Sequence, residues 1–192
     1  MGAFNTARTF GWVSRLLHWL ISVATIGLFV LALWYRTLDY GHPWYVSAPA
    51  LHVSIGFVLV GFLVFRIAWS LTGPFPEHVG NSALENRLAT LMHWALRLSL
   101  AALVVTGYLY ATADGRPASI FGVVEVPALP MAKSLKGTVG WVHEYLSWTV
   151  IALASLHGLA ALKHHFVDRD DTLRRMVSGR RTSPRDQRES RT

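Results

Sequence analysis

The segment that decides the fold is GTVGWVHEYLSWTVIALASLHGLAAL, residues 137–162. It contains one acidic residue, Glu144, and neither Lys nor Arg, and it ends where Lys163 begins a polar stretch. A helix needs about 20 mostly apolar residues to cross a bilayer, because its backbone polar groups must be satisfied inside the segment. The segment therefore predicts a membrane-spanning helix.

Three further stretches have the same character. Residues 16–35 carry no formal charge, residues 50–71 only Arg66, and residues 88–111 only Arg97. Trp and Tyr gather near the ends of these stretches, as they do at membrane interfaces. The sequence predicts an all-α, integral membrane four-helix bundle formed by residues 1–177. We expect the third connection to be a loop, and residues 178–192 to be a basic, disordered tail.

Composition supports a membrane protein. Of the 192 residues, 52% are hydrophobic and 15% are charged, against about 25% charged in a typical soluble domain. The net charge of +7 does not indicate nucleic-acid binding, because Lys and Arg lie at the ends of the apolar runs and in the tail. Four of the 18 basic residues fall on the side opposite the termini: Arg36, Arg116, Lys133 and Lys136. The positive-inside rule therefore predicts cytoplasmic termini.

Histidine is the residue type left for metal chemistry. The chain has no cysteine and nine histidines, which excludes disulfides, iron–sulfur clusters, thiolate metal sites and cysteine nucleophiles. His143 and His157 lie 14 residues apart on the fourth predicted helix. At 3.6 residues per turn they lie within about 40° of one face and about 21 Å apart along the axis. One helix therefore offers ligands at two depths.

The remaining histidines near span ends complete two layers. With cytoplasmic termini, His52 lies with His143 near the outer face, and His18 and His93 lie with His157 near the cytoplasmic face. Imidazoles from two facing helices can hold a haem iron between them. The layers predict two haems with one histidine to spare in the inner layer, although a single histidine near a helix end is more often an interfacial polar residue. Such an arrangement would carry electrons across the bundle.

Other residues inside the spans have two interpretations each. Arg66 follows His52 by 14 residues, and Arg97 lies one turn beyond His93. Each guanidinium can pair with a haem propionate or extend toward lipid phosphates. Glu144 either orients the neighbouring histidine or reaches the outer surface. Glycines that would give a flat ring access to the backbone, or serve helix packing, are Gly27, Gly56, Gly61, Gly107 and Gly158.

Several short segments together resemble a known family. They are SRLLHW (14–19), LHVSIG (51–56), WVHE (141–144), LH (156–157), KHHF (163–166) and DDTLRRM (170–176). Through these segments, residues from about 9 to 176 resemble the bacterial cytochrome b561 family of dihaem four-helix membrane proteins. The similarity points to the superoxide oxidase branch, which passes electrons from superoxide to ubiquinone.

The resemblance implies a specific set of site residues. It implies two haem b groups, the inner bound by His18 and His157 and the outer by His52 and His143, as axial ligands of the iron. The third inner-layer histidine is then not a ligand. A quinone contact is implied for His164. The connection before the fourth helix departs from the family pattern, which affects the substrate more than the haem ligands.

The functional hypothesis is an oxidoreductase that takes electrons from superoxide at the periplasmic side, releases O2 and reduces ubiquinone. Lys133, Lys136 and Arg116 would attract the superoxide anion. One alternative is a cytochrome b subunit that carries electrons between a dehydrogenase or hydrogenase partner and quinone. A second alternative is a histidine-containing transporter without a cofactor, although the spans contain few charges along a continuous pathway.

Overall fold

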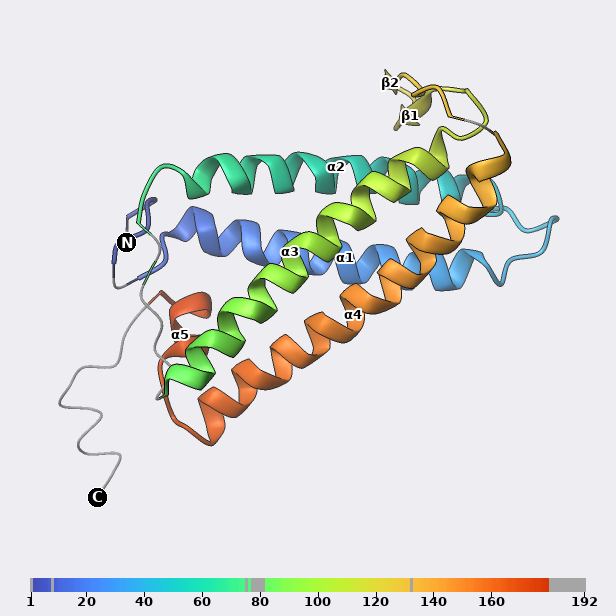
Figure 1. The fold of residues 1–192 in the computed structure, drawn as a ribbon. Coiled ribbons are helices and arrows are strands. Elements are labelled where there is room, and N and C mark those ends of the chain that lie inside the picture. The colour runs from blue at the N-terminus through green and yellow to red at the C-terminus, as the bar shows by residue number, and fades with distance from the viewer. Residues whose placement is uncertain (1, 8, 75, 77–81, 132, 180–192) are drawn as a thin grey trace.

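The computed structural model describes residues 2–7, 9–74, 76, 82–131 and 133–179, so most of the predicted tail lies outside the described residues. Its main elements are α1 (Trp12–Tyr35), α2 (Ser47–Ser70), α3 (Ala83–Ala111), α4 (Lys136–Phe166) and the short α5 (Thr172–Val177). The first four are long and apolar enough to cross a membrane (Figure 1). The prediction of a helical protein with four spans is confirmed.

The helices extend beyond the apolar stretches that predicted them. Helix α3 begins five residues early, at Ala83, because Ser82 caps it: the Ser82 hydroxyl accepts a hydrogen bond from the Glu85 N–H at 3.1 Å. Helix α4 continues through Lys163 to Phe166, where basic side chains in the last turn suit the negative end of the helix dipole. Hydropathy detects the part of a helix in lipid, whereas capping sets where the helix begins and ends.

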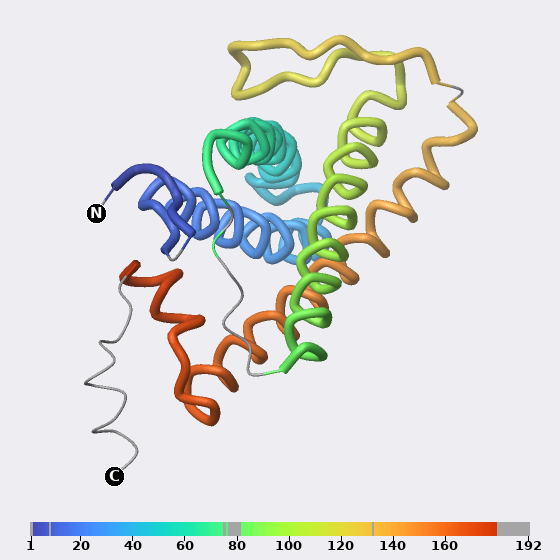
Figure 2. Tube along the Cα trace, turned by 60° about the vertical axis from the view of Figure 1, so that its left-hand side comes forward, coloured from blue at the N-terminus to red at the C-terminus, as the bar shows by residue number. Residues whose placement is uncertain are grey.

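The spanning helices are arranged as two pairs. Helix α1 packs along α2 and α3 along α4, whereas α2 meets α3 over a shorter stretch. Figures 1 and 2 show the α3/α4 pair crossing the α1/α2 pair. A small core forms between α1, α2 and α3 around Ile21, Leu28 and Leu59, with Phe62 and Leu100 packed against it. Many large apolar side chains elsewhere on the helices are exposed, as expected of lipid-facing surface.

The third connection contains a β-hairpin that the sequence analysis did not predict. Strands β1 (Ala118–Ile120) and β2 (Val124–Val126) pair antiparallel, and Phe121 and Gly122 turn the chain with φ of 51° and 72°. The Ser54 hydroxyl on α2 accepts a hydrogen bond from the Phe121 N–H at 3.0 Å, so the hairpin packs against that helix. Three-residue strands are too short to produce a recognisable alternation. We call this end of the bundle the hairpin end.

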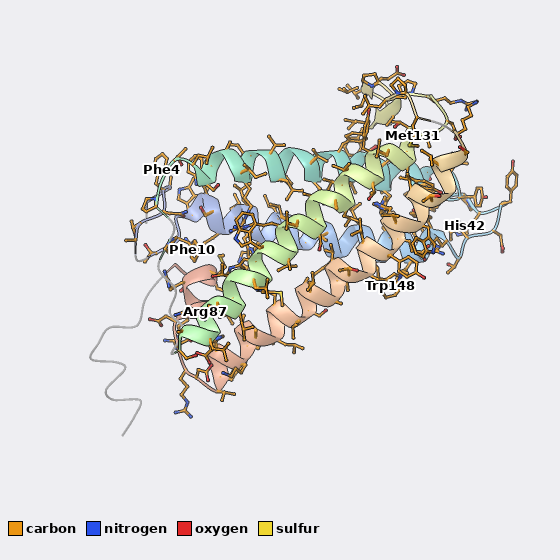
Figure 3. All side chains as sticks on the ribbon, in the orientation of Figure 1. Phe4, Phe10, His42, Arg87, Met131 and Trp148 are labelled. Atoms are coloured by element: carbon orange, nitrogen blue, oxygen red, sulfur yellow. The ribbon has the colours of Figure 1, made fainter. Side chains whose placement is uncertain are left out.

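The N-terminal segment and α5 lie together at the opposite end, which we call the termini end. The Arg15 Nη1 donates to the Val177 carbonyl at 3.0 Å, and the Trp19 Nε1 donates to that of Met176 at 3.2 Å. The Arg175 guanidinium lies 5.6 Å from the centre of the Phe10 ring. Figure 3 shows Phe10 at this end and Met131 at the hairpin end. The end of helix α5 is therefore held against the first turns of α1 by hydrogen bonds.

Candidate haem-binding sites

The structure brings four of the predicted ligands together in two facing pairs. His52 of α2 faces His143 of α4 near the hairpin end, with ring centroids 6.5 Å apart and ring planes at 82°. His18 of α1 faces His157 of α4 nearer the termini end, at 6.3 Å and 71°. We call these the hairpin-end pair and the termini-end pair. They combine the histidines as the family resemblance implied.

The spacing of both pairs fits one iron atom between two imidazoles. A metal–imidazole bond of about 2 Å, plus about 1.1 Å from the nitrogen to the ring centre, puts the two centroids about 6 Å apart. Ring planes that contain the same iron–nitrogen axis can adopt any mutual angle. The centroids of His93 and His157 are 5.3 Å apart, too close for an iron between them. His93 is therefore a neighbour of the termini-end pair.

The hydrogen bonds of His143 leave one ring nitrogen for a metal. Its Nδ1 lies 3.1 Å from the Leu103 carbonyl oxygen and 3.3 Å from the Thr106 Oγ1. A carbonyl oxygen can only accept, so the Nδ1 carries the proton and the Nε2 retains its lone pair. This arrangement, in which the second nitrogen donates to backbone, is typical of metal-bound histidine.

Gly107 lies against the imidazole of His143. A Cβ at this position would lie 2.9 Å from the His143 Cε1, so the absent side chain makes room for the imidazole. Access of a haem ring at this and the other predicted glycines stays a prediction. At the other four glycines of that set, a Cβ would meet nothing within 4 Å.

Two residues next to each other at the end of α1 connect to the hairpin-end pair. The Tyr35 ring lies edge-on to His52, with centroids 5.7 Å apart. The Arg36 Nη1 donates to the Glu144 Oε1 at 2.6 Å. Glu144 therefore reaches the surface and binds α1, which decides between its two interpretations. Tyr35 could not be recognised as a site residue from sequence, because its position fits an interfacial aromatic equally well.

The two intramembrane arginines lie near the termini-end pair. The Arg66 Nη1 is buried, and the described residues supply it with no hydrogen-bond partner. Arg66 lies close enough to His18 and to Arg97 for their charges to interact, and the Arg97 guanidinium lies 5.4 Å from the centre of the Trp94 ring. A buried guanidinium in a membrane needs an acceptor. A carboxylate such as a haem propionate meets that need, so these residues fit the group.

The charges of the three predicted steering residues all act on one carboxylate at the hairpin end, that of Asp114. The Lys136 Nζ donates to the Asp114 Oδ2 at 2.5 Å. This hydrogen bond lowers the pKa of the exposed Asp114, and the charges of Lys133 and Arg116 act in the same direction. The ammonium group of Lys136 is therefore compensated by a carboxylate.

His164 is held by acidic residues at the termini end. Its Nδ1 lies 2.8 Å from the Asp170 Oδ2 and 3.0 Å from the Asp168 Oδ2. The three side chains could in principle hold a cation, but the Lys163 Nζ already donates to Asp168 at 2.8 Å. His164 follows His157 by two helical turns and so lies on the same face of α4, about 10 Å further along.

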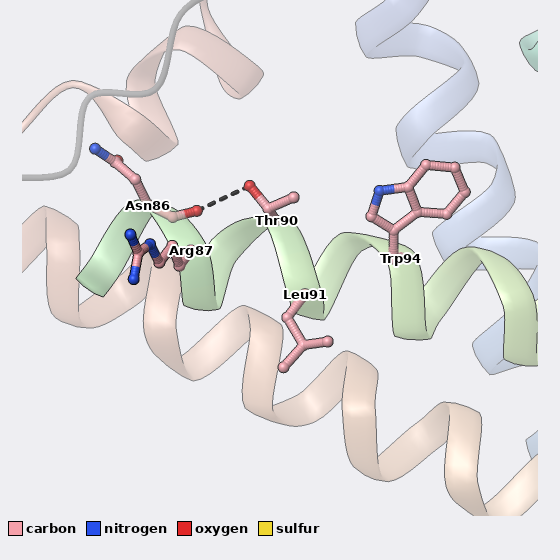
Figure 4. Close-up of a pocket in the computed structure, with 5 residues that line it drawn as sticks. All are labelled: Asn86, Arg87, Thr90, Leu91 and Trp94. Carbon is pink, nitrogen blue, oxygen red and sulfur yellow. Dashed lines mark hydrogen bonds between the residues drawn. The ribbon is translucent and has the colours of Figure 1, made fainter. Parts of the chain in front are cut away.

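An open groove of about 400 Å³ lies on the first half of α3 (Figure 4). Its lining consists of Asn86, Arg87, Thr90, Leu91 and Trp94. The Thr90 hydroxyl donates to the Asn86 carbonyl at 2.9 Å, which satisfies it within the helix. The described lining of this groove includes none of the predicted ligands.

Histidines that face in pairs between spanning helices fit the haem ligation of membrane cytochromes of the b type, a class that transfers electrons. A family model described as prokaryotic cytochrome b561 matches residues 9–179, and the chain belongs to that family. It is therefore a multi-pass membrane protein of an electron-transfer family that binds haem b.

Individual relatives agree with this assignment. The chain is 44% identical over 179 residues to cytochrome b561 homolog 2 of Escherichia coli (strain K12), covering 92% of this chain and 95% of the relative. It is 31% identical over 140 residues to the probable superoxide oxidase CybB of Yersinia pestis, covering 72% and 78%. Over 101 residues it is 31% identical to cytochrome b561 homolog 1 of Escherichia coli (strain K12), covering 52% and 56%.

Proposed function

We propose that the chain binds two haem b groups, one in each histidine pair, and transfers electrons from superoxide to ubiquinone. The observation that carries this proposal is the spacing of the pairs, 6.5 Å and 6.3 Å between ring centroids. The distribution of basic residues supports cytoplasmic termini in the bacterial inner membrane, with the hairpin end in the periplasm. Arg66 and Arg97 would bind propionates of the haem at the termini-end pair.

The bound haem supplies a one-electron change at iron. His18 with His157, and His52 with His143, would each supply two imidazoles to one haem iron, so the protein would transfer electrons without binding superoxide or O2 at the metal. Two superoxide anions each lose one electron and leave as O2. One quinone accepts the two electrons and two protons and becomes quinol.

Each substrate has a candidate position. The similarity to a probable superoxide oxidase supports superoxide as the donor, and Lys133, Lys136 and Arg116 would attract it at the hairpin end. His164 with its partner Asp170 would contact the quinone at the termini end, where the ring nitrogen and the carboxylate, 2.8 Å apart, can pass a proton.

Two measurements on one purified sample test the function: a visible spectrum that gives the haem content, and the reaction that follows addition of superoxide. We expect about two haem b per chain, and quinol formation when superoxide is added to purified protein with a quinone analogue. Prior addition of superoxide dismutase is the control, and it must abolish the reaction. Protein without haem after purification from haem-replete cells would support the transporter hypothesis instead.

If the hairpin end attracts superoxide, substitutions at the two bonded residues Lys136 and Asp114 should change the rate in opposite directions. We expect Lys136→Gln to lower kcat/KM for superoxide roughly twofold to fivefold at low ionic strength, and Asp114→Asn to raise it, because each changes the local charge by one unit. Both differences should shrink in about 0.2 M salt as charges are screened. Arg87→Gln, a charge change on the first half of α3, is the matched control. Equal rates in all three variants would exclude steering by this cluster.

Two observations favour a second candidate, a cytochrome b subunit that receives electrons from a dehydrogenase or hydrogenase partner. At the hairpin end the cations of Arg36 and Lys136 are each bonded to a carboxylate, which weakens attraction of a small anion. The hairpin also exposes the apolar side chains of Phe121, Val123 and Val124, a surface suited to a protein partner. Two haems without superoxide activity in the isolated protein would select this candidate.

A further inference from the structure

We propose that three residues of this chain adjust the reduction potentials of the two haem sites. Thr106 and Leu103 would lower the potential at the hairpin-end pair, and Arg66 would raise it at the termini-end pair. The inference rests on the proposed haem ligation by the four histidines.

At the hairpin-end pair, two oxygens face the proton of the ligand His143. The Nδ1 donates to the Leu103 carbonyl at 3.1 Å, and the Thr106 Oγ1 lies 3.3 Å from the same nitrogen. The Thr106 hydroxyl has its shorter contact with the Ala102 carbonyl, 2.8 Å, against 3.0 Å to that of Leu103. We therefore place its hydrogen on Ala102, which leaves an oxygen lone pair facing the Nδ1–H.

Acceptors on this proton change the ligand electronically. They draw the proton from the imidazole and increase the electron density that its Nε2 donates to a metal. A more strongly donating ligand stabilises ferric over ferrous iron and lowers the reduction potential. The cation close to this site, Arg36, does not offset the effect, because Glu144 binds it at 2.6 Å.

The surroundings of the termini-end pair would raise the reduction potential instead of lowering it. Within the part of the chain that the structure describes, the rings of His18 and His157 have no hydrogen-bond acceptor comparable to the Leu103 carbonyl. The buried Arg66 lies close enough to His18 for their charges to interact. Paired with a haem propionate, its guanidinium would cancel a negative charge that otherwise stabilises ferric iron, and in a medium of low dielectric constant this favours the ferrous state. Arg66 therefore raises the potential at this pair.

The lowered potential at the hairpin-end pair and the raised potential at the termini-end pair add to one potential difference. Each favours electron transfer from the hairpin end toward the termini end, the direction needed if the donor reacts in the periplasm. The potential difference belongs to the chain itself, whatever the identity of the donor or acceptor.

A redox titration of the purified holoprotein, followed by the visible spectrum, tests the inference. We expect two waves in the unaltered protein, and His52→Ala, which removes the hairpin-end haem, should retain the higher one. Thr106→Val should raise the lower wave and leave the other unmoved, whereas Thr106→Ser should leave both unmoved. Thr149→Val is the matched control, because the Thr149 hydroxyl bonds only to its own helix, at Tyr145, among the described residues.

The second arm of the titration uses Arg66. We expect Arg66→Gln to lower the higher wave, so that the two waves approach each other, and Arg66→Lys to keep it high because the charge is retained. Arg66→Met, which also removes the charge and keeps an unbranched side chain, provides the measurement if the glutamine variant does not fold. Arg87→Gln, an exposed arginine on α3, controls for loss of a distant charge.

The possible outcomes separate this inference from the function on which it rests. A single wave that accounts for both haems would overturn the inference. So would an unchanged or decreased potential of the lower wave in Thr106→Val, or an unchanged potential of the higher wave in Arg66→Gln. Retention of both haems by His52→Ala would instead refute the proposed ligation. Two responsive waves in a protein inactive with superoxide would support the inference and exclude superoxide as the donor.

Discussion

Replacement of His143 by alanine is expected to reduce the haem content from about two to about one per chain. In the proposed ligation His143 and His52 supply the two imidazoles of one site, and removal of either would leave an iron with a single protein ligand. The other pair, His18 and His157, shares no side chain with this site and should keep its haem. The measurement is the haem-to-protein ratio together with the reduced-minus-oxidised spectrum.

His93→Ala is the control for this experiment. His93 lies close to the ligand His157, at 5.3 Å between ring centroids, yet it does not fit as a ligand itself. We expect this variant to retain both haems. Loss of a haem in His93→Ala, or two haems in His143→Ala at unchanged helix content by circular dichroism, would show that the histidines are paired differently.

Gly107→Ala is expected to weaken haem binding at the hairpin-end pair without removing a ligand. The added Cβ would lie 2.9 Å from the His143 Cε1 and 3.3 Å from its Nδ1, so the ring must move. Overpacking of this kind costs about 1–3 kcal/mol, which corresponds to roughly fivefold to 150-fold in haem affinity. The ring movement would also lengthen the hydrogen bond to the Leu103 carbonyl. The loss of haem during dialysis against apomyoglobin measures this effect.

Gly61→Ala is the matched control for that substitution. Gly61 also lies inside a spanning helix, but a Cβ there meets nothing within 4 Å. We expect this variant to hold both haems as tightly as the unaltered protein. If Gly107→Ala retained haem equally well, the contact between Gly107 and His143 would have no role in binding.

The membrane class, the four spans and the depth of each histidine follow from the order of residues along the chain. These properties are local, because apolar run length reports whether a helix can cross a bilayer, and helical periodicity gives the relative position of residues on one helix. The 14-residue spacing of His143 and His157 is therefore enough to put them on one face at two depths. The pairing of His18 with His157, and the exclusion of His93, required the family resemblance.

Contacts between helices depend instead on the tertiary structure. The use of Gly107 to make room for an imidazole depends on how α3 is rotated against α4, and the bond from Arg36 to Glu144 depends on where α1 ends beside α4. The approach of Thr106 to the His143 nitrogen has the same origin. Rotation and crossing of helices follow from the packing of many side chains at once. No single segment of sequence records them, and so the spans could be predicted whereas the groups that tune the sites could not.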